Sequence, residues 1–336
     1  MVAAATLGLP ERSDDGRNYD YRYIWIRDQT YAGLACAVSE PHPLLDEALA
    51  FVTARVLEHG DRLAPAYLPD GGSVPTETTL GLPGYPGGSD TVGNWVRHQF
   101  QLDTCGEILQ LLAAGARTGH LNAEHERAID IVINTIERRW QAPEAGIWEL
   151  HDAWWTQSRL ACVAGLRSMA RYLPPPRQHA AFGLASAILA ETNRTCLAPD
   201  GYWQRSPDHR GTDASLLLPA VRGAIAASDR RTLATLHQVE SSLTHNGHVY
   251  RYRVDDRPLG QAEGAFTLCG FFMCLAHLQQ GNLTTAFRYF DQQRGVCGPP
   301  NLFAEEFDTR QRQLRGNLPQ GFVHAMLLEC SQRLPS

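Results

Sequence analysis

Apolar residues recur at intervals of three and four positions along most of the chain, as in LDTCGEILQLLAAGA (102–116) and HAAFGLASAILAETN (179–193). This spacing marks one face of an α-helix, because a helix completes a turn in about 3.6 residues. It predicts an all-α protein with hardly any strand. The eleven predicted helices cover residues 28–39, 43–58, 98–118, 122–140, 153–173, 177–194, 213–227, 229–242, 262–280, 282–294 and 319–333.

The segments between the predicted helices are of two kinds. Some are short and hold helix breakers or caps, such as Gly119-His120 and Gly281-Asn282. Others are long and rich in glycine, proline and aromatic residues, and such loops in a compact domain are usually functional. Short and long segments alternate, which predicts helical hairpins in a ring with the long loops at one end; an irregular bundle is the alternative. The long segments cover residues 60–97, 141–152, 195–212, 243–261 and 295–318.

The composition narrows the class of protein. No linker divides the 336 residues, so we expect a single domain over residues 1–336. Hydrophobic residues make up 43% and charged residues 20%, as in ordinary soluble globular proteins. The net charge of −6 and the lack of a basic block argue against a nucleic-acid partner. No apolar run approaches the roughly 18 residues of a membrane helix, so no membrane partner is expected. The sequence makes no prediction of the oligomeric state.

The eight cysteines are scattered, and neither a Cys-x-x-Cys pair nor the spacing of a zinc site occurs. Several lie in apolar helical runs, for example Cys162 and Cys274, which predicts buried free thiols in a reducing compartment. The first residues lack the features of a secretory signal, so a cytoplasmic location is expected. His98, His151 and His324 do not form a metal-binding set, and we expect no metal and no cofactor.

The run RNYDYRYIWIRD (17–28) is the most informative stretch for function. Aromatic residues occupy every second position in it: Tyr19, Tyr21, Tyr23 and Trp25. An extended backbone would place these rings on one side. Aromatic faces beside arginine donors and carboxylate acceptors suit a sugar ring with its C–H faces and hydroxyl rim. An aromatic edge strand is the alternative. The adjacent Arg27 and Asp28 favour the sugar site, since buried opposite charges need several partners.

Two loops combine carboxyl groups with aromatic residues. Glu149 follows Trp148 in GIWE, and Glu305 and Glu306 are flanked by phenylalanines in NLFAEEFD. A carboxyl group against an aromatic wall is desolvated, which favours its protonated form, whereas a wetter carboxylate stays ionised and can activate water. One acid and one base are what cleavage of a glycosidic bond requires. Taken singly, each glutamate also fits a helix cap or a surface position.

The chain resembles glycoside hydrolase family 15, which includes glucoamylases, glucodextranases, isomaltose-cleaving glucosidases and some bacterial trehalases. The run at 17–28 is similar to the bacterial signature RNWDYRYCWLRD of that family, with Tyr19 and Ile24 as conservative departures. Six further matches follow in the same order and cover nearly the whole chain: VGNWVRHQFQLDTCGE (92–107), GIWEL (146–150), VYRYRVDD (249–256), AEGAFTLCGFF (262–272), NLFAEEFD (301–308) and GNLPQGFVH (316–324).

The resemblance implies an (α/α)6 barrel whose active site is a pocket of long loops at one end. It assigns Glu149 as the general acid and Glu305 as the general base. It assigns a larger group to substrate binding, with the aromatic members as ring contacts: Arg27, Asp28, Trp25, Tyr85, Trp148, Arg251 and Glu306. Hydrolysis in the family proceeds with inversion and releases β-glucose.

The resemblance favours an exo-acting α-glucosidase that releases glucose from the non-reducing ends of short malto- or isomalto-oligosaccharides. An α,α-trehalase is the alternative within the enzyme class, and an inactive sugar-binding or structural barrel is the alternative outside it. The second alternative arises because the first motif lies close to the start of the chain. The barrel is therefore expected to lack the first of its twelve helices, as in a truncated family member. A ring left open in this way would expose apolar helix faces.

Overall fold

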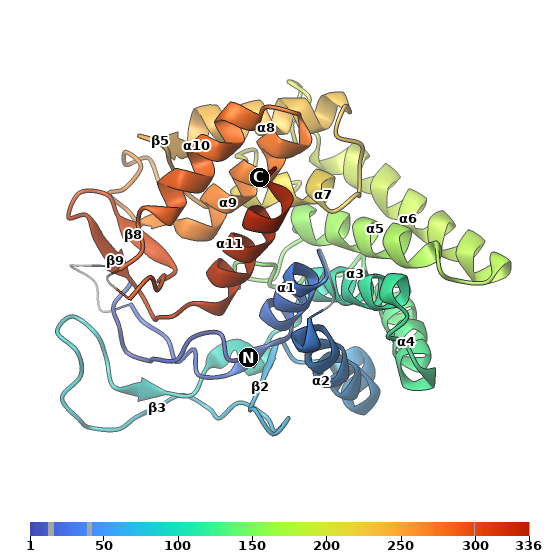
Figure 1. Ribbon diagram of the computed structural model, residues 1–336, viewed down its shortest axis with the longest axis horizontal. Helices are drawn as coiled ribbons and strands as arrows, with labels where there is room; N and C mark the ends of the chain where they lie inside the picture. The colour runs from blue at the N-terminus through green and yellow to red at the C-terminus, as the bar shows by residue number, and fades with distance from the viewer. Residues whose placement is uncertain (13–16, 39–41, 299, 336) are drawn as a thin grey trace.

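The computed structural model describes residues 1–12, 17–38, 42–298 and 300–335. Helices dominate these residues (Figure 1). The α-helices are α1 (Ile26–Cys36), α2 (Pro43–His59), α3 (Leu102–Thr118), α4 (Ala123–Arg139), α5 (Thr156–Ala170), α6 (Pro175–Cys196), α7 (Leu218–Val221), α8 (Arg230–Leu243), α9 (Thr267–Gln279), α10 (Leu283–Arg294) and α11 (Gly321–Arg333). The 3₁₀ helices are η1 (Gly60–Arg62), η2 (Trp95–His98) and η3 (Ala214–Leu217).

The strands are only two or three residues long and lie within the long loops. They are β1 (Ile24–Trp25), β2 (Ala66–Tyr67), β3 (Thr78–Thr79), β4 (Thr91–Val92), β5 (Thr244–His245), β6 (His248–Val249), β7 (Ala265–Phe266), β8 (Glu306–Asp308) and β9 (Gln313–Arg315). All pairings are antiparallel, and β7, β8 and β9 form the one three-stranded sheet of the described residues. In its register Phe266 faces Glu306, which joins the loops before α9 and α11.

The odd-numbered helices form a closed inner ring. Each packs against the next, from α1 through α3, α5, α7 and α9 to α11, and α11 returns to α1. The even-numbered helices lie outside them, with α2 on α1, α4 on α3, α6 on α5 and α10 on α9 (Figure 1). The expectation of an open ring is therefore wrong, because the described helices already close the inner layer.

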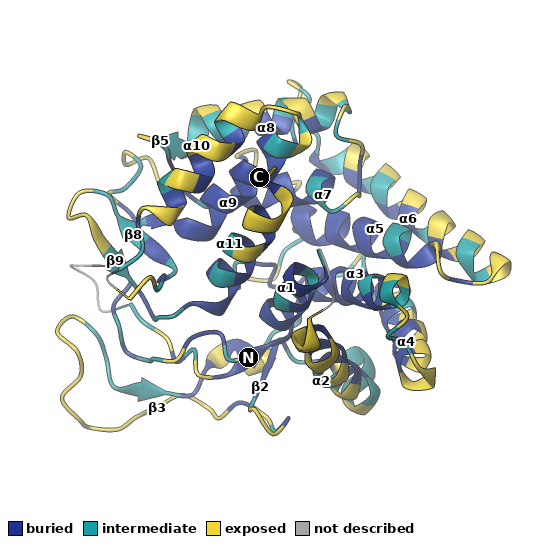
Figure 2. Cartoon of the chain, viewed as in Figure 1, coloured by how far each residue is buried: buried dark blue, intermediate teal, exposed yellow. Residues whose placement is uncertain are grey.

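Burial distinguishes the two layers. Helix α9 is buried along Thr267–His277, whereas the buried residues of α8 recur on one face at intervals of three and four. Figure 2 shows the same contrast between α9, which is almost entirely dark blue, and the outer helices, whose outward faces are yellow. An inner helix is covered on all sides and needs few polar residues, while an outer helix buries only one stripe.

Helices α3 and α5 approach each other closely because both carry glycine at the crossing. A Cβ atom on Gly106 would lie 2.3 Å from the backbone of Ala161, and one on Gly165 would lie 2.2 Å from the Gly106 carbonyl oxygen. Neither position leaves room for a side chain without moving a helix. The contact fixes the two inner helices that begin beside the candidate site.

The predicted helices all correspond to helices of the structure, and their ends differ locally. The predicted helix at 213–227 extends too far, because η3 and α7 together span only Ala214–Val221. Pro219 has no N–H and belongs to a first helical turn, and Gly223, at φ +86°, ends the segment. The predicted end of the first helix at residue 39 lies outside the described residues.

The alternation of short and long connections is confirmed. Each outer helix follows its inner partner after a short turn, and a long loop leads to the N-terminus of the next inner helix. The eight cysteines are free, as predicted, with Cys297 alone partly accessible among these described residues. In the described part of the chain no helix has the length and apolar character needed to cross a membrane.

Candidate active site

A cavity of about 310 Å³ lies where the long loops meet. Its lining comes from the N-terminal segment before α1 and from the loops that precede α3, α5, α9 and α11. Because these loops lead into inner helices, their residues converge on one end of the ring. The long loop at 195–212 does not contribute to the lining that the described residues form.

The aromatic run supplies one wall of the cavity. Tyr19 and Tyr21 stack with their ring centroids 6.0 Å apart, and Tyr21 meets Trp25 edge-on at 5.5 Å. These three rings line the cavity, whereas Tyr23 is buried and donates its hydroxyl to Asp20 at 2.8 Å. The expectation that all four rings share one side therefore holds for three of them. In this described run only Ile24 and Trp25 form a strand. The strict alternation of side chains that an extended strand imposes therefore does not hold at Tyr23, which points into the interior.

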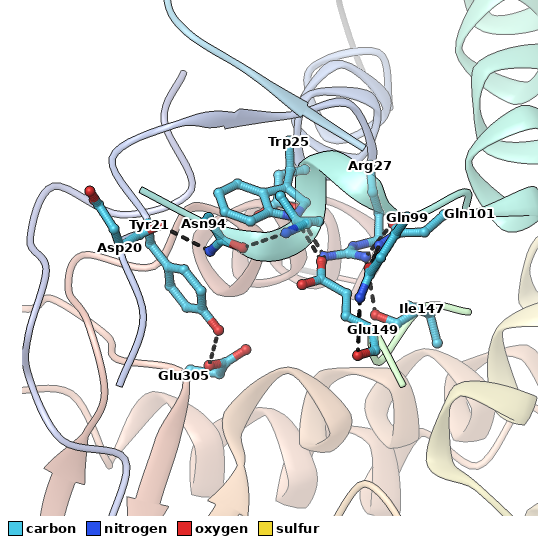
Figure 3. Close-up of polar contacts among 12 residues, drawn as sticks. Asp20, Tyr21, Trp25, Arg27, Asn94, Gln99, Gln101, Ile147, Glu149 and Glu305 are labelled. Carbon is cyan, nitrogen blue, oxygen red and sulfur yellow. Dashed lines mark hydrogen bonds and ion pairs between the residues drawn. The ribbon is translucent and has the colours of Figure 1, made fainter. Parts of the chain in front are cut away.

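Glu149 faces the cavity from the loop before α5 (Figure 3). The indole N–H of Trp25 donates to its Oε1 at 2.7 Å, and Arg27 donates to the same oxygen at 3.2 Å. The side chain keeps 25% of its accessible surface. Its backbone is left-handed, at φ +55°, a conformation that costs a non-glycine residue about 1–3 kcal/mol and that clusters at functional sites.

A buried ion pair holds the turn that carries Glu149. Arg159 donates to Glu144 at 2.7 Å, and both side chains are fully buried. The other oxygen of Glu144 accepts the backbone N–H groups of Gly146 at 2.8 Å and Leu102 at 3.1 Å. The pair therefore joins this turn to the start of α3 and to α5. Burial raises the pKa of Glu144 to about 7, against the charge of Arg159.

Glu305 lines the same cavity from the loop before α11. Tyr21 donates its hydroxyl to the Glu305 carboxyl group at 3.1 Å (Figure 3). Burial, followed by the nearby negative charge of Glu11, raises the pKa of Glu305 to about 8, and Arg251 opposes the change. Glu305 is therefore protonated at neutral pH when the site is empty.

Glu306 points away from the cavity, so its predicted contact with substrate is wrong. It is fully buried and lies outside the cavity lining that the described residues form. Its carboxylate accepts the Gly264 N–H at 2.8 Å and an N–H of Arg17 at 3.1 Å. Neighbouring residues of an extended segment point to opposite sides, so Glu305 and Glu306 cannot both face the sugar.

Arg27 and Asp28 lie in the first turn of α1 and line the cavity. Arg27 also donates to the carbonyl oxygen of Ile147 at 3.0 Å and to Gln101 at 3.3 Å. The Asp28 carboxylate is 3.6 Å from Arg27, yet neither oxygen has a hydrogen bond among the described residues. Burial raises the pKa of Asp28 to about 6. A buried carboxyl group that lacks a hydrogen bond and lies beside a cavity can accept one from a hydroxyl group of a ligand.

Of the remaining residues predicted to contact the substrate, two line the cavity and one lies outside it. Trp148 and Arg251 line the cavity; Trp148 donates its N–H to Asp213 at 2.8 Å, and Arg251 is held by Glu263 at 2.8 Å. Tyr85 is 54% exposed and lies outside the cavity that the described residues form, so its predicted ring contact is wrong. Its loop carries the exposed segment around β3 and β4, and tyrosine identity alone could not reveal that.

Several lining residues were not foreseen from the sequence: Glu11, Glu77, Trp95, Phe266 and Gln320. Each is a single residue in a loop or at a helix start, without a repeating pattern around it. Only the fold brings them together. In the described part of the chain no group of three or more His, Cys, Asp and Glu side chains could hold a metal ion. The chemistry that this lining offers is acid–base chemistry on a hydroxyl-rich ligand.

Comparison with known proteins agrees with this geometry. The family described as "Glycosyl hydrolases family 15" matches residues 1–332. The trehalase of Mycolicibacterium smegmatis is 29% identical over 355 residues, covering 98% of this chain and 51% of that protein. Trehalase 1 of Sulfolobus acidocaldarius is 29% identical over 340 residues, covering 97% and 59%. The chain thus spans between half and three fifths of these curated relatives.

Solved structures show the fold. A bacterial glucoamylase complexed with acarbose superposes with a TM-score of 0.77 at 15% identity, covering 99% of this chain and 52% of that chain. The predicted all-α toroid is thereby confirmed. Because the family match extends over nearly the whole sequence, the chain belongs to glycosyl hydrolase family 15.

Proposed function

We propose that this chain hydrolyses α,α-trehalose to glucose, acting on a single disaccharide in the cavity. The observation that carries the proposal is the pair of carboxyl groups, Glu149 and Glu305, in one polar and aromatic cavity. The trehalase names of two relatives with 29% identity support this substrate over the oligosaccharides favoured from the sequence. The match covers only part of those relatives, so the activity is a proposal for this chain.

The size of the cavity supports a short substrate. Its volume of about 310 Å³ lies at the lower end of the roughly 300–1,000 Å³ typical of small-molecule sites. A polymer-degrading enzyme that cuts within a chain needs a cleft open at both ends. A small cavity at one end of a helical ring instead suits removal of one terminal sugar from a disaccharide.

In the proposed mechanism Glu149 protonates the glycosidic oxygen while Glu305 takes a proton from the attacking water. Water attacks the anomeric carbon from the face opposite the leaving group, so the configuration inverts. The two carboxyl groups then need a separation of about 6.5–9.5 Å, which leaves room for the water. Trehalose would yield one β-glucose, from the attacked ring, and one α-glucose, from the leaving ring.

The ion pair between Arg27 and Glu149 adds a requirement to this mechanism. A carboxylate that accepts hydrogen bonds from Arg27 and Trp25 is not ready to donate a proton. We propose that the hydroxyl groups of the bound sugar engage Arg27 and Asp28 and weaken that ion pair. Glu149 can then take up the proton that it delivers to the leaving oxygen.

A second candidate substrate is a longer α-glucan, cleaved from its non-reducing end. Trp95 lines the cavity and is 62% exposed, so its ring is accessible from solvent at the cavity edge. Such a ring can stack on a further sugar beyond the first two. This feature favours malto- or isomalto-oligosaccharides, which the sequence alone put first.

Hydrolysis of trehalose, maltose and isomaltose, measured side by side, tests the proposal. Proton NMR of the first products distinguishes α- from β-glucose before the two forms equilibrate. We expect trehalose to be preferred and to give equal amounts of both anomers. Preference for maltose or isomaltose would favour the second candidate, and two α-glucoses from trehalose would exclude inversion. No hydrolysis of any substrate by the folded protein would indicate an inactive sugar-binding or structural barrel.

The variants Glu149→Gln and Glu305→Gln test the two roles separately. General acid–base groups contribute about 10²- to 10⁴-fold, so each variant should lose at least a hundredfold in kcat. Calorimetric titration with trehalose should still detect binding, because both variants keep the shape of the cavity. Activity retained in Glu305→Gln would remove Glu305 from the role of base.

A further inference from the structure

A third carboxyl group stands beside the two already described. Glu11 lines the cavity from the N-terminal segment and is 5% exposed. Gly316 separates it from Glu305: a Cβ atom built on this glycine would lie 3.5 Å from Cγ of Glu11 and 3.8 Å from Cβ of Glu305. The two glutamate side chains therefore flank one glycine.

The partner of Glu11 is shared with a second carboxylate. Arg17 contacts Glu11 at 2.6 Å and Glu306 at 3.1 Å. One guanidinium thus serves two buried carboxyl groups, so it compensates only one of them when both are ionised. Burial raises the pKa of both groups, and Arg17 opposes this change. Of the two, Glu11 lines the cavity with Glu305 and lies across Gly316 from it, whereas Glu306 points away.

The other groups around Glu305 do not neutralise this charge. Arg251 lines the cavity from the loop before α9 and opposes the rise in the pKa of Glu305, but Glu263 binds its guanidinium through both carboxylate oxygens, at 2.8 to 3.1 Å. The described residues place a set of charged and titratable groups around Glu305: Glu11, Tyr19 and Tyr21 from the N-terminal segment, with Arg17 bound to Glu11; Glu149 from the loop before α5; Arg251 from the loop before α9, with Glu263 bound to it; Cys269 of α9; and the adjacent Glu306.

We infer that Glu11 is a positioning residue that makes Glu305 a stronger base, by keeping a negative charge beside it that Arg17 only partly compensates. The inference rests on the proposed role of Glu305. A carboxylate next to another negative charge binds a proton more tightly. A general base acts best when its pKa lies near the working pH, and an ordinary glutamate titrates far below neutrality. Glu11 thus adapts Glu305 to neutral or mildly alkaline conditions.

The pH dependence of kcat/KM, measured on the α-glucoside that the parent protein cleaves best, tests the inference. The active form holds one proton in all, with Glu149 protonated and Glu305 ionised, so kcat/KM should fall as the pH rises through the pKa of Glu305 in the free protein, about 8. In Glu11→Gln the midpoint of this fall should move down by about one pH unit. Glu11→Asp keeps the charge and should leave the midpoint in place.

Arg17→Gln should shift the midpoint in the opposite direction. Removing the guanidinium leaves the Glu11 carboxylate uncompensated, so the fall in kcat/KM should move to higher pH. Glu77→Gln is the matched control, because Glu77 also lines the cavity but is exposed, and its side chain accepts the backbone N–H of Trp95. The midpoint in Glu77→Gln should coincide with that of the parent. A midpoint that stays in place in Glu11→Gln, or that moves the same way in Glu11→Gln and Arg17→Gln, would overturn the inference.

A second measurement does not need hydrolysis. In protein labelled with ¹³C at the glutamate side-chain carboxyl, the resonance missing from Glu305→Gln belongs to Glu305. Its titration midpoint should fall by about one pH unit in Glu11→Gln. An unchanged midpoint overturns the inference even if no α-glucoside is cleaved, so its failure is distinct from failure of the proposed function. If Glu11→Gln does not fold by circular dichroism, the midpoint in Arg17→Gln decides: a rise supports the inference and no change overturns it.

Discussion

Replacing Glu305 by glutamine should stabilise the protein, and more so at higher pH. Glutamine has nearly the same shape and can still accept the hydroxyl hydrogen bond that Tyr21 donates at 3.1 Å. It cannot ionise. The parent protein, in contrast, must hold a carboxylate in a site whose burial and nearby Glu11 charge disfavour it. Residues placed for catalysis commonly reduce stability in this way.

The magnitude follows from the pKa of Glu305 in the folded and unfolded states. Folding raises it from 4.5 to about 8, so the folded protein binds this proton more tightly. The stability that the proton contributes is complete below pH 4.5 and is lost as the pH rises toward 8. Within that window the loss is about 1.4 kcal/mol per pH unit. Partial exposure of the group reduces it, so we expect a loss of about 2–3 kcal/mol between pH 5 and pH 8.

Urea unfolding followed by circular dichroism at pH 5, 6, 7 and 8 measures the effect. Buried carboxyl groups distant from Glu305, such as Glu144, titrate in parent and variant alike, so the difference between the two curves reports the titration of Glu305 together with its interaction with Glu11. That difference should grow by about 2–3 kcal/mol from pH 5 to pH 8. A constant difference across this range would refute the reasoning, because it would mean that Glu305 titrates near 4.5 in the folded state.

Four further substitutions test other parts of the structure. Arg159→Met should cost about 3–5 kcal/mol in urea unfolding, because it leaves Glu144 buried without its partner, and the double variant with Glu144→Gln should recover part of the loss. Gly106→Ala should lower stability by at least about 1–3 kcal/mol, since its Cβ would meet helix α5 at 2.3 Å; an unchanged melting temperature would contradict that packing. Trp25→Phe removes the N–H that orients the Glu149 carboxyl group toward the cavity, so the misplaced acid should lower kcat about tenfold or more in steady-state assays, and an unchanged kcat would show that Trp25 does not position it. Tyr85→Ala should keep kcat/KM within about twofold of the parent value, since the residue is exposed outside the cavity lining. A large loss would show that Tyr85 contacts the substrate after all.

Much of the fold could be predicted because helical periodicity is a local signal. Each stretch with apolar residues three and four apart became a helix, and the long connections all lead to inner helices. The failure at 213–227 has a local cause that periodicity does not register, namely Pro219 and Gly223 within an apolar run. The start of α9 was placed too early because Ala265 and Phe266 pair with β8, some 40 residues away, and a long-range pairing leaves no local trace.

The sequence identified some residues of the candidate site and missed others, and the reason is again the difference between local and long-range signals. Motifs identified Glu149 and Glu305, and the structure brings both to one cavity. The choice between Glu305 and Glu306 depends on which side of a short extended segment faces the cavity, and the register of β8 against β7 sets that. Glu11 had no pattern to mark it, because its importance comes from Gly316 and Arg17, which reach it only in the fold.

The protonation of the empty site bears on how the enzyme would start its reaction. The proposed base, Glu305, holds a proton at neutral pH, and the proposed acid, Glu149, is ion-paired with Arg27. Catalysis needs the reverse arrangement, so one proton must leave Glu305 and one must reach Glu149 before the bond can break. Sugar hydroxyl groups at Arg27 and Asp28 would favour the second step by competing for the guanidinium. Sugar binding and the transfer of protons between the two carboxyl groups are then coupled, so Glu149 and Glu305 reach their catalytic protonation states only when a sugar occupies the cavity.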